Sequence, residues 1–214
     1  MKKNNLYIIG AGGYGREIAS YLNSSETLKE KFFFKGFIDD NLSALKTTNC
    51  PYQIVATLAE FKFTKDDFVI LAIGNIDAKK KIVQKLKGKV SFYSFIAKNV
   101  YVGNNVKIGE GVLLCPGVKL PANIVIGDFV SINIDSRIGH DCIIGNFCSI
   151  MPNVDVGGEC IIGSDVFLST KSTILPRTSV ADSTNIGTAS VILKDIIEPK
   201  GTFFGNPGRR MLNK

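Results

Sequence analysis

The sequence predicts a small N-terminal α/β domain with a parallel, Rossmann-like half sheet, followed by a left-handed parallel β-helix of six-residue repeats. Three observations support this fold class. Strands and helices alternate in the first part of the chain, and a glycine-rich segment joins the first strand to the first helix. In the second part, an aliphatic residue recurs at every sixth position.

Residues 1–93 are expected to form the α/β domain. Apolar runs bounded by turn residues indicate strands, and amphipathic stretches between them indicate helices. Because the two kinds of element alternate, we expect a parallel sheet with helical crossovers. The expected strands are Leu6–Ile9, Phe32–Ile38 and Phe68–Ile73, and the expected helices are Arg16–Asn23, Leu58–Phe61 and Asp77–Leu86.

The segment from Gly10 to Gly15 reads GAGGYG and fits the pattern G-x-G-x-x-G between a strand and a helix. Backbone N–H groups at the start of such a helix favour an anion. Asp39 follows about where a dinucleotide fold places its ribose-binding acid. Three strands supply only one mononucleotide-binding half, so we favour the nucleotide of a nucleotide sugar over NAD(P). A tight turn without a ligand is the alternative.

Residues 94–197 carry the six-residue rhythm, which fits neither a helix nor a plain alternating strand. It fits a short strand followed by a corner, with the aliphatic side chain pointing inward. A compact residue four positions later fills the interior, and the glycine that often follows the aliphatic residue is expected to permit the backbone of the corner. The aliphatic positions are Ile96, Val102, Ile108, Leu114, Leu120, Ile126, Ile132, Ile138, Ile144, Ile150, Val156, Ile162, Leu168, Ile174, Val180, Ile186 and Ile192.

Three hexads close one triangular coil, so each residue is expected to stack on the residue eighteen positions later. Successive coils of such a helix pair as parallel strands about 4.8 Å apart. Residues 198–214 form a tail after the last hexad.

Composition excludes several classes of function. The net charge is +7, but the lysines are scattered without an aromatic-interleaved motif, so no nucleic-acid partner is expected. No apolar run reaches the length of a membrane span. Cys142, Cys148 and Cys160 occupy small inward positions without disulfide spacing, which favours a cytoplasmic protein. A single histidine cannot supply a three-histidine zinc site, and no metal is expected.

The single histidine, His140, is the strongest candidate for catalysis. It lies at an outward corner, where neutral imidazole would act as a general base. Asp141 is adjacent and could orient the ring, and Asn133 replaces glycine in its hexad. Gly158 should stack on His140, and its N–H could stabilise an oxyanion. The alternatives are a solvated surface histidine and, for Asn133, a residue that tolerates a left-handed corner.

The chain resembles the bacterial sugar acetyltransferases of the hexapeptide-repeat superfamily. The resemblance is to the group of sialic acid O-acetyltransferases and N-acetyltransferases of nucleotide-linked 4-amino-4,6-dideoxy sugars. It rests on the opening IIGAGGYGREIA, on GFIDD and LAIGN at two strand ends, on the hexads with INIDSRIGHDCIIGNFCSI, and on the closing FFGNPGRRM.

This resemblance implies a homotrimer with acetyl-CoA bound in the groove between two β-helices. It implies that His140 is the base, with Asp141 and Asn133 in the same site and the Gly158 amide facing the thioester. The residues expected along the coenzyme are Ser169, Gly187, Thr188, Gly205, Asn206 and Pro207. The N-terminal residues expected to hold the nucleotide are Gly12, Gly13, Tyr14, Gly15, Arg16, Asp39, Asp40 and Asn75, with Tyr14 standing where some relatives carry histidine.

The expected function is acetyl-CoA-dependent N-acetylation of the 4-amino group of a nucleotide-linked 4-amino-4,6-dideoxy sugar. The resemblance places this reaction in bacterial surface glycan biosynthesis, such as that of O-antigen lipopolysaccharide. One alternative is O-acetylation of sialic acid or another sugar. Others are a non-catalytic trimeric scaffold that binds a ligand and a nicotinamide-dependent enzyme.

Overall fold

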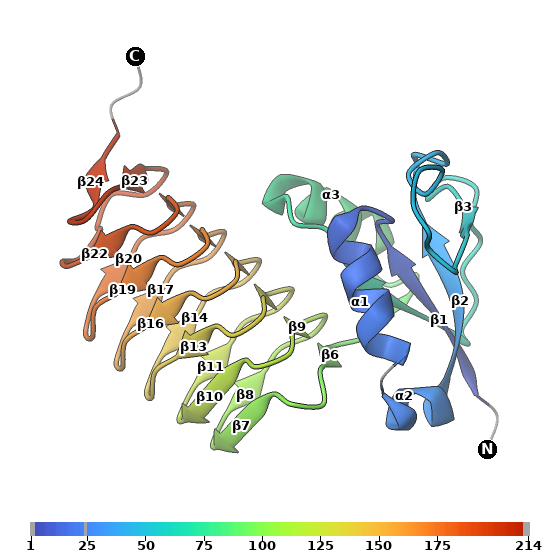
Figure 1. The fold of residues 1–214 in the computed structure, drawn as a ribbon, viewed down its shortest axis with the longest axis horizontal. Coiled ribbons are helices and arrows are strands. Elements are labelled where there is room, and N and C mark those ends of the chain that lie inside the picture. Colours follow the sequence, from blue (N-terminus) through green and yellow to red (C-terminus); the bar gives the residue numbers. More distant parts are fainter. Residues whose placement is uncertain (1–2, 24, 212–214) are drawn as a thin grey trace. The chain divides into compact units, whose positions relative to one another are not determined.

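A computed structural model describes residues 3–23 and 25–211 (Figure 1). The chain divides into two compact units, Met1–Tyr93 and Ser94–Lys214. The first unit is a parallel sheet with helices, and the second is a β-solenoid consistent with a left-handed parallel β-helix. The fold class predicted from the sequence is therefore confirmed.

The N-terminal unit contains a five-stranded parallel sheet in the order β3-β2-β1-β4-β5. The C-terminal halves of its three middle strands are buried, as is usual when both faces of a parallel sheet are covered. The strands are β1 Asn4–Ile9, β2 Phe32–Ile38, β3 Ile54–Ala56, β4 Asp67–Leu71 and β5 Ser91–Phe92. The helices are α1 Gly13–Asn23, α2 Glu26–Lys31 and α3 Ile76–Leu86.

Two sequence expectations for this unit are wrong. Five strands are present instead of three, because β3 and β5 are too short to give an alternating pattern. No helix forms at Leu58–Phe61. The Phe61 N–H bonds to the Thr57 carbonyl at 3.1 Å, which closes a single turn. One isolated turn does not propagate, because helix initiation costs more than one hydrogen bond returns.

The second unit stacks short parallel strands into three sheets, of six, five and eight strands among the described residues. Paired residues are separated by eighteen positions, as for Ile138 with Val156 and Ile132 with Ile150. Apart from the ends, the hexad residues are buried and form one continuous core. The strands are β6 Phe95–Ile96, β7 Tyr101–Asn104, β8 Lys107–Ile108, β9 Leu113–Leu114, β10 Lys119–Ala122, β11 Val125–Ile126, β12 Ser131–Ile132, β13 Arg137–Ile138, β14 Ile143–Ile144, β15 Ser149–Ile150, β16 Asp155–Val156, β17 Ile161–Ile162, β18 Phe167–Leu168, β19 Thr173–Ile174, β20 Ser179–Val180, β21 Asn185–Ile186 and β22 Val191–Ile192.

The aliphatic residues of the first two hexads are less buried than those of the later coils. Ile96 and Val102 are 43% and 40% exposed, whereas Leu114 and Leu120 in the next coil are fully buried. In its sheet, each of the two strands that carry these residues, β6 and β7, pairs with a neighbouring coil on one side only. A terminal coil of a solenoid lacks half of the packing that interior coils receive.

The expected role of glycine directly after the aliphatic residue is also wrong. The left-handed residue lies two positions after this glycine, as Asp141 (φ 59°) does after Gly139, and Asn123 (φ 54°) occupies the same hexad position. Asn133 does not have a left-handed backbone. A Cβ at Gly139 would lie 2.4 Å from the backbone nitrogen of Gly158 in the next coil. Glycine at this position therefore permits successive coils to pack closely.

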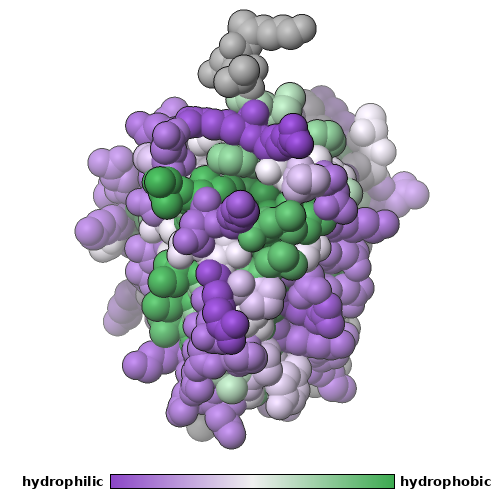
Figure 2. All heavy atoms as spheres, turned by 90° about the vertical axis from the view of Figure 1, so that its left-hand side faces the viewer, coloured by the Kyte–Doolittle hydropathy of each residue, from purple (hydrophilic) through white to green (hydrophobic). Residues whose placement is uncertain are grey.

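The tail continues the solenoid. Strand β23 (Thr202–Phe204) pairs in parallel with β21. Strand β24 (Arg209–Arg210) then pairs antiparallel with β23. Figure 2 views this end of the molecule and shows apolar side chains surrounded by polar ones. The exposed apolar side chains of the last segment are those of Leu193, Ile197, Phe204 and Met211.

Candidate active site at the corner after β13

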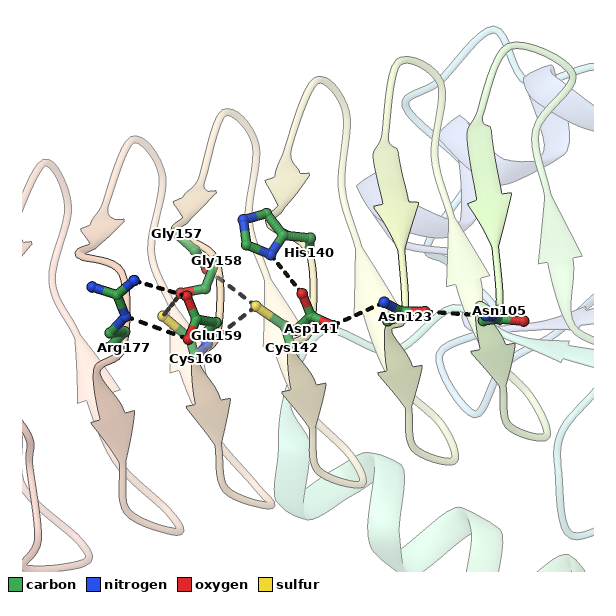
Figure 3. Close-up of polar contacts among 10 residues, drawn as sticks. All are labelled: Asn105, Asn123, His140, Asp141, Cys142, Gly157, Gly158, Glu159, Cys160 and Arg177. Carbon is green, nitrogen blue, oxygen red and sulfur yellow. Dashed lines mark hydrogen bonds and ion pairs between the residues drawn. The ribbon is translucent and has the colours of Figure 1, made fainter.

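His140 lies at the corner between β13 and β14, with 59% of its side chain exposed. Its Nδ1 is 2.7 Å from Oδ2 of Asp141 (Figure 3). Adjacent side chains on an extended strand diverge, but here Asp141 has a left-handed backbone at φ 59°. The corner therefore turns the carboxylate toward the imidazole, and the pairing expected from the sequence is present.

Asp141 is held by two donors, one on each oxygen. Oδ2 faces His140, and Oδ1 accepts a 2.9 Å hydrogen bond from Nδ2 of Asn123. The hydrogen bond from His140, and next that from Asn123, lowers the pKa of the Asp141 carboxyl below its usual range. Asp141 is therefore an anion at neutral pH.

An anionic Asp141 fixes the tautomer of a neutral His140. A carboxylate can only accept hydrogen bonds, so the ring proton must lie on Nδ1. Nε2 then carries the lone pair that a general base needs. Nε2 faces the next coil, because a Cβ built on Gly158 would lie 2.7 Å from it. The stacking of Gly158 on His140, inferred from the eighteen-residue coil, is confirmed.

The Gly158 amide donates to no acceptor among the described residues. The next corner of the coil shows the contrast. There, backbone N–H groups at the matching position bond to the side chain eighteen residues later, as the N–H of Asp128 does to Asn146 Oδ1 at 2.8 Å. The residue eighteen positions after Gly158 is Pro176, which offers no side-chain acceptor. A free N–H therefore lies beside Nε2 of His140, as an oxyanion site requires.

A hollow of about 420 Å³ lies on the outer face of the same sheet and reaches Gly139 and Gly157, the residues directly before His140 and Gly158. Lys119, Arg137 and Asp155 contribute to its lining, and Arg137 forms an ion pair with Asp155. Open space therefore extends up to the backbone that carries the imidazole and the free amide.

Asn123 was missed by the sequence analysis. It precedes Asp141 by one coil, as Asn105 precedes Asn123, and Nδ2 of Asn105 donates to Oδ1 of Asn123 at 3.2 Å. On the other side of Asp141, Arg177 binds Glu159 through Nη2 and Oε1 at 3.2 Å. Figure 3 shows these side chains in one row. The eighteen-residue spacing that relates Gly158 to His140 also relates Asn123 to Asp141, so it is the sequence signal for this row.

Asn133 does not contact His140 within one chain. It follows β12, one corner before His140, is 8% exposed, and its Oδ1 accepts from the N–H of Ile134 at 2.7 Å. Ser169 and Gly187 follow at intervals of thirty-six and eighteen residues, so all three occupy one column of corners. The candidate residues of the solenoid therefore lie on two different edges of the prism.

The proposed coenzyme residues on this second edge form a connected surface. Ser169 Oγ and Thr188 Oγ1 are 2.8 Å apart. The tail lies on the last coil, where the Gly205 N–H donates to Ser190 Oγ at 3.0 Å and the Gly208 N–H to the carbonyl of Val191. The Asn206–Pro207 peptide bond is cis. Pro207 and Gly208, with Arg209 and Lys194, line a hollow of about 330 Å³.

The candidate nucleotide residues of the N-terminal unit meet at one edge of its sheet. Ile9 at the end of β1 is in register with Ile38 of β2 and Leu71 of β4. The carboxyl ends of these strands lie together, and the strand order reverses between β1 and β4. Parallel α/β sheets bind ligands at such a switch point.

The glycine loop has the geometry of an anion site. α1 begins at Gly13, and the N–H groups of Gly12, Gly13 and Gly15 donate to no acceptor among the described residues. A Cβ at Gly15 would lie 1.9 Å from the Gly10 carbonyl oxygen, whereas one at Gly12 or Gly13 would meet nothing within 4 Å. Gly15 therefore serves packing, and Gly12 and Gly13 leave open space for a ligand.

The polar residues expected around this loop have structural partners. Asp39 Oδ2 accepts from the N–H of Ala11 at 2.6 Å, and Asp40 Oδ1 accepts from that of Leu58 at 2.8 Å. Asn75 caps α3 by accepting from Ala78. Arg16 Nη1 reaches the Ala11 carbonyl at 3.4 Å. The loop is thus fixed at its base by Asp39, and Tyr14, at the start of α1, is partly exposed.

Within residues 3–23 and 25–211, no group of three or more His, Cys, Asp or Glu side chains is arranged to hold a metal ion. Over the same residues, every helix is too short or too polar to cross a membrane. None of the five cysteines, all of which lie within these ranges, forms a disulfide, and Cys115, Cys142, Cys148 and Cys160 are buried.

Comparison with known proteins gives matches to both units. Residues 5–86 match the PglD N-terminal domain, and residues 141–176 match the bacterial transferase hexapeptide of six repeats. WeeI from Acinetobacter baumannii AYE is 30% identical, with a TM-score of 0.85 over 96% of this chain and 99% of that one. The chain therefore belongs to the hexapeptide-repeat sugar acetyltransferases that begin with a PglD-type domain.

Two further relatives carry descriptive names. The GDP-perosamine N-acetyltransferase of Escherichia coli O157:H7 is 30% identical over 143 residues, 64% of this chain and 62% of the relative, so the match spans less than two thirds of that protein. PerB from Caulobacter crescentus, solved with CoA and GDP-perosamine, is 22% identical with a TM-score of 0.86 over 97% of both chains. At this identity, the second match supports the fold.

Proposed function

We propose that this protein transfers the acetyl group of acetyl-CoA to the 4-amino group of a nucleotide-linked 4-amino-4,6-dideoxy sugar. The observation that carries the proposal is the corner after β13. There, an anionic Asp141 sets the tautomer of His140, and the unpaired Gly158 N–H lies beside Nε2. A scaffold protein needs neither a free imidazole lone pair nor an unpaired amide next to it.

Each group has a defined task in the reaction. The neutral amine attacks the thioester carbonyl carbon and forms the new C–N bond, and Nε2 of His140 accepts the proton that the nitrogen loses. The Gly158 N–H donates to the oxygen on which negative charge develops. When the C–S bond breaks, the CoA thiolate takes the proton from His140. The base is thereby restored.

The acceptor nucleotide belongs to the N-terminal unit in this proposal. Three free N–H groups at the start of α1 suit a diphosphate, Arg16 is close to the loop, and Asp39 and Asn75 lie at neighbouring strand ends. A free sialic acid has no diphosphate for this loop. The names of the E. coli and Caulobacter relatives favour a GDP-linked 4-amino sugar among the candidates.

We propose a homotrimer, because the candidate residues lie on two edges of one solenoid. The His140 edge of one subunit and the Asn133–Ser169–Gly187 edge of its neighbour would then form the site together, with acetyl-CoA between them. The outward side chains of Val125, Ile143 and Ile161 support this. They are 41%, 48% and 52% exposed and stack on successive strands of one sheet. A continuous exposed apolar stripe of this kind is expected on a surface that another subunit covers.

We further propose a cytoplasmic location and a role in surface glycan biosynthesis. The lack of disulfides among the five cysteines and the absence of a spanning helix among the described residues are compatible with that compartment. The proposed donor and an activated nucleotide sugar are both cytoplasmic metabolites of glycan assembly.

The acceptor is tested by measuring free thiol released from acetyl-CoA. UDP-, dTDP- and GDP-linked 4-amino-4,6-dideoxy sugars and free sialic acid would be compared at equal concentration. We expect rapid thiol release with one nucleotide sugar. Mass spectrometry of the product should show that the acetyl group is on the sugar nitrogen. Release with sialic acid alone would replace this proposal by O-acetylation, and acetyl-CoA binding without turnover on any acceptor would contradict the proposed substrate class.

A further inference from the structure

We propose that Asn123 is a positioning residue for the His140–Asp141 pair, and that Asn105 fixes its amide in the working orientation. This inference rests on the proposed role of His140 as the base. It assigns a task to two side chains that lie one and two coils before the reacting imidazole.

The carboxylate of Asp141 is oriented by hydrogen bonds rather than by packing. Asp141 is 48% exposed and its backbone is left-handed, so nothing in the core fixes its χ angles. Its plane is set by two hydrogen bonds, from His140 to Oδ2 and from Asn123 to Oδ1. Without Asn123, Oδ1 is free to turn to water, and both oxygens can compete for the imidazole.

The side-chain amide of Asn123 is held in one orientation. Asn123 has a donor end and an acceptor end, and only the donor end can face an anionic carboxylate. Its Oδ1 therefore points away from Asp141 and needs a donor, which Nδ2 of Asn105 supplies at 3.2 Å. All donors along the row, Asn105, Asn123 and His140, thus point toward Asp141, and the row has one direction.

On the other side of Asp141, Glu159 is paired with Arg177. Glu159 is the next residue in the row, and a second free carboxylate there would compete for the imidazole and raise the pKa of Asp141. Arg177 instead binds it from the far side, with Nε to Oε2 at 3.3 Å and Nη2 to Oε1 at 3.2 Å. Asp141 is therefore oriented from the Asn123 side alone (Figure 3).

The test variants are Asn123→Gly and Asn123→Asp. Glycine removes the side chain without backbone strain, since Gly111 and Gly117 occupy the same hexad position with positive φ. Aspartate keeps the shape but replaces the donor by an acceptor. Ser183→Gly is the control on the third edge of the solenoid, because Ser183 has the same hexad position with φ 57° and its side chain makes no hydrogen bond with the described residues.

The first readout is the tautomer of His140, which is the only histidine of the chain. In untagged protein labelled with ¹⁵N-histidine, one pair of ring nitrogen signals reports whether the proton lies on Nδ1. The wild type and Ser183→Gly are expected to hold the proton on Nδ1. In Asn123→Gly, Asn123→Asp and, more weakly, Asn105→Gly, the share of the Nε2-protonated ring should rise.

The second readout is the acetyl transfer rate with the best acceptor. Both Asn123 variants should lower kcat about tenfold with little change in either KM, since positioning partners of a reacting group commonly contribute this much. Unchanged kcat and tautomer in both Asn123 variants, with His140→Ala inactive, would overturn this inference and leave the proposed function intact. If His140→Ala keeps near wild-type kcat, the proposed role of His140 as the base fails, and the tautomer measurement alone decides the role of Asn123.

Discussion

Gly158 lies directly over the imidazole of His140, so that a Cβ at position 158 would be 2.7 Å from Nε2. The corner itself accepts side chains, because Ala122 and His140 occupy the same position in the two preceding coils. Glycine is thus needed at 158 for the sake of the histidine and the free amide.

Gly158→Ala should lower kcat at least tenfold, because the new methyl group displaces the ring from the position that the reaction uses. The melting temperature should change little, since the contact is with an exposed side chain. Steady-state kinetics and thermal unfolding measure the two effects. Full activity in this variant would show that neither the ring position nor the adjacent amide matters.

Gly12→Ala and Gly15→Ala should have different effects. A Cβ at Gly12 meets nothing within 4 Å, so this variant should fold normally and raise KM for the nucleotide sugar while KM for acetyl-CoA stays the same. At Gly15 the Cβ would overlap the Gly10 carbonyl, and the free energy of unfolding should fall by about 1–3 kcal/mol. Equal KM values for the acceptor in Gly12→Ala and the wild type would argue against a nucleotide at this loop.

Asp141→Asn should lower kcat about tenfold or more, because the neutral amide cannot stabilise the imidazolium that forms during transfer. In the wild type, Asp141 itself should not titrate near neutrality, because the hydrogen bonds from His140 and Asn123 hold the pKa of its carboxyl below the usual range. Steady-state kinetics with acetyl-CoA and the best acceptor measure the effect. An unchanged kcat in Asp141→Asn would separate Asp141 from the base.

Ile143→Lys should weaken the proposed trimer. Ile143 is 48% exposed at the centre of the apolar stripe, and three lysines brought together at a closed interface would repel one another and lose hydration. Size-exclusion chromatography with light scattering should find smaller species, and activity should fall with them. Asn185→Lys, on an exposed position of β21 in another sheet, is the control. A monomeric wild type with full activity would contradict the shared site.

Thiol labelling of the native protein should modify Cys50 alone. Cys115, Cys142, Cys148 and Cys160 are fully buried, and the hydrogen bond with Cys160, together with burial, raises the pKa of the Cys142 thiol. Burial keeps all four sulfur atoms out of contact with the reagent. Titration with a disulfide reagent should give one equivalent before denaturation and five after it. Rapid modification of several thiols in the folded protein would contradict the packed interior.

The sequence analysis predicted the parts of the molecule that a short fixed period controls. The eighteen-residue coil fixes which side chains stack, so Gly158 could be assigned to His140 without coordinates. The same rule pairs Asn123 with Asp141, but asparagine on a corner also has a purely conformational explanation, so the spacing alone does not assign Asn123 a role.

Other features could not be predicted because they depend on non-local contacts. Strand β5, only two residues long, is a strand because β4 lies beside it. The left-handed positions of the corners carry residues as different as Phe129 and Arg177, so no residue type marks them. The partners of Asp39 at the base of the glycine loop depend on how β1 and β2 align.

The most direct test of the central claim is the rate of thiol release from acetyl-CoA with the best nucleotide-linked 4-amino sugar, for the wild type and His140→Ala at neutral pH. We predict rapid acetylation of the amine by the wild type and a kcat lower by about a hundredfold or more in the variant. KM for both substrates should change little. A His140→Ala variant with near wild-type kcat would contradict the assignment of His140 as the base.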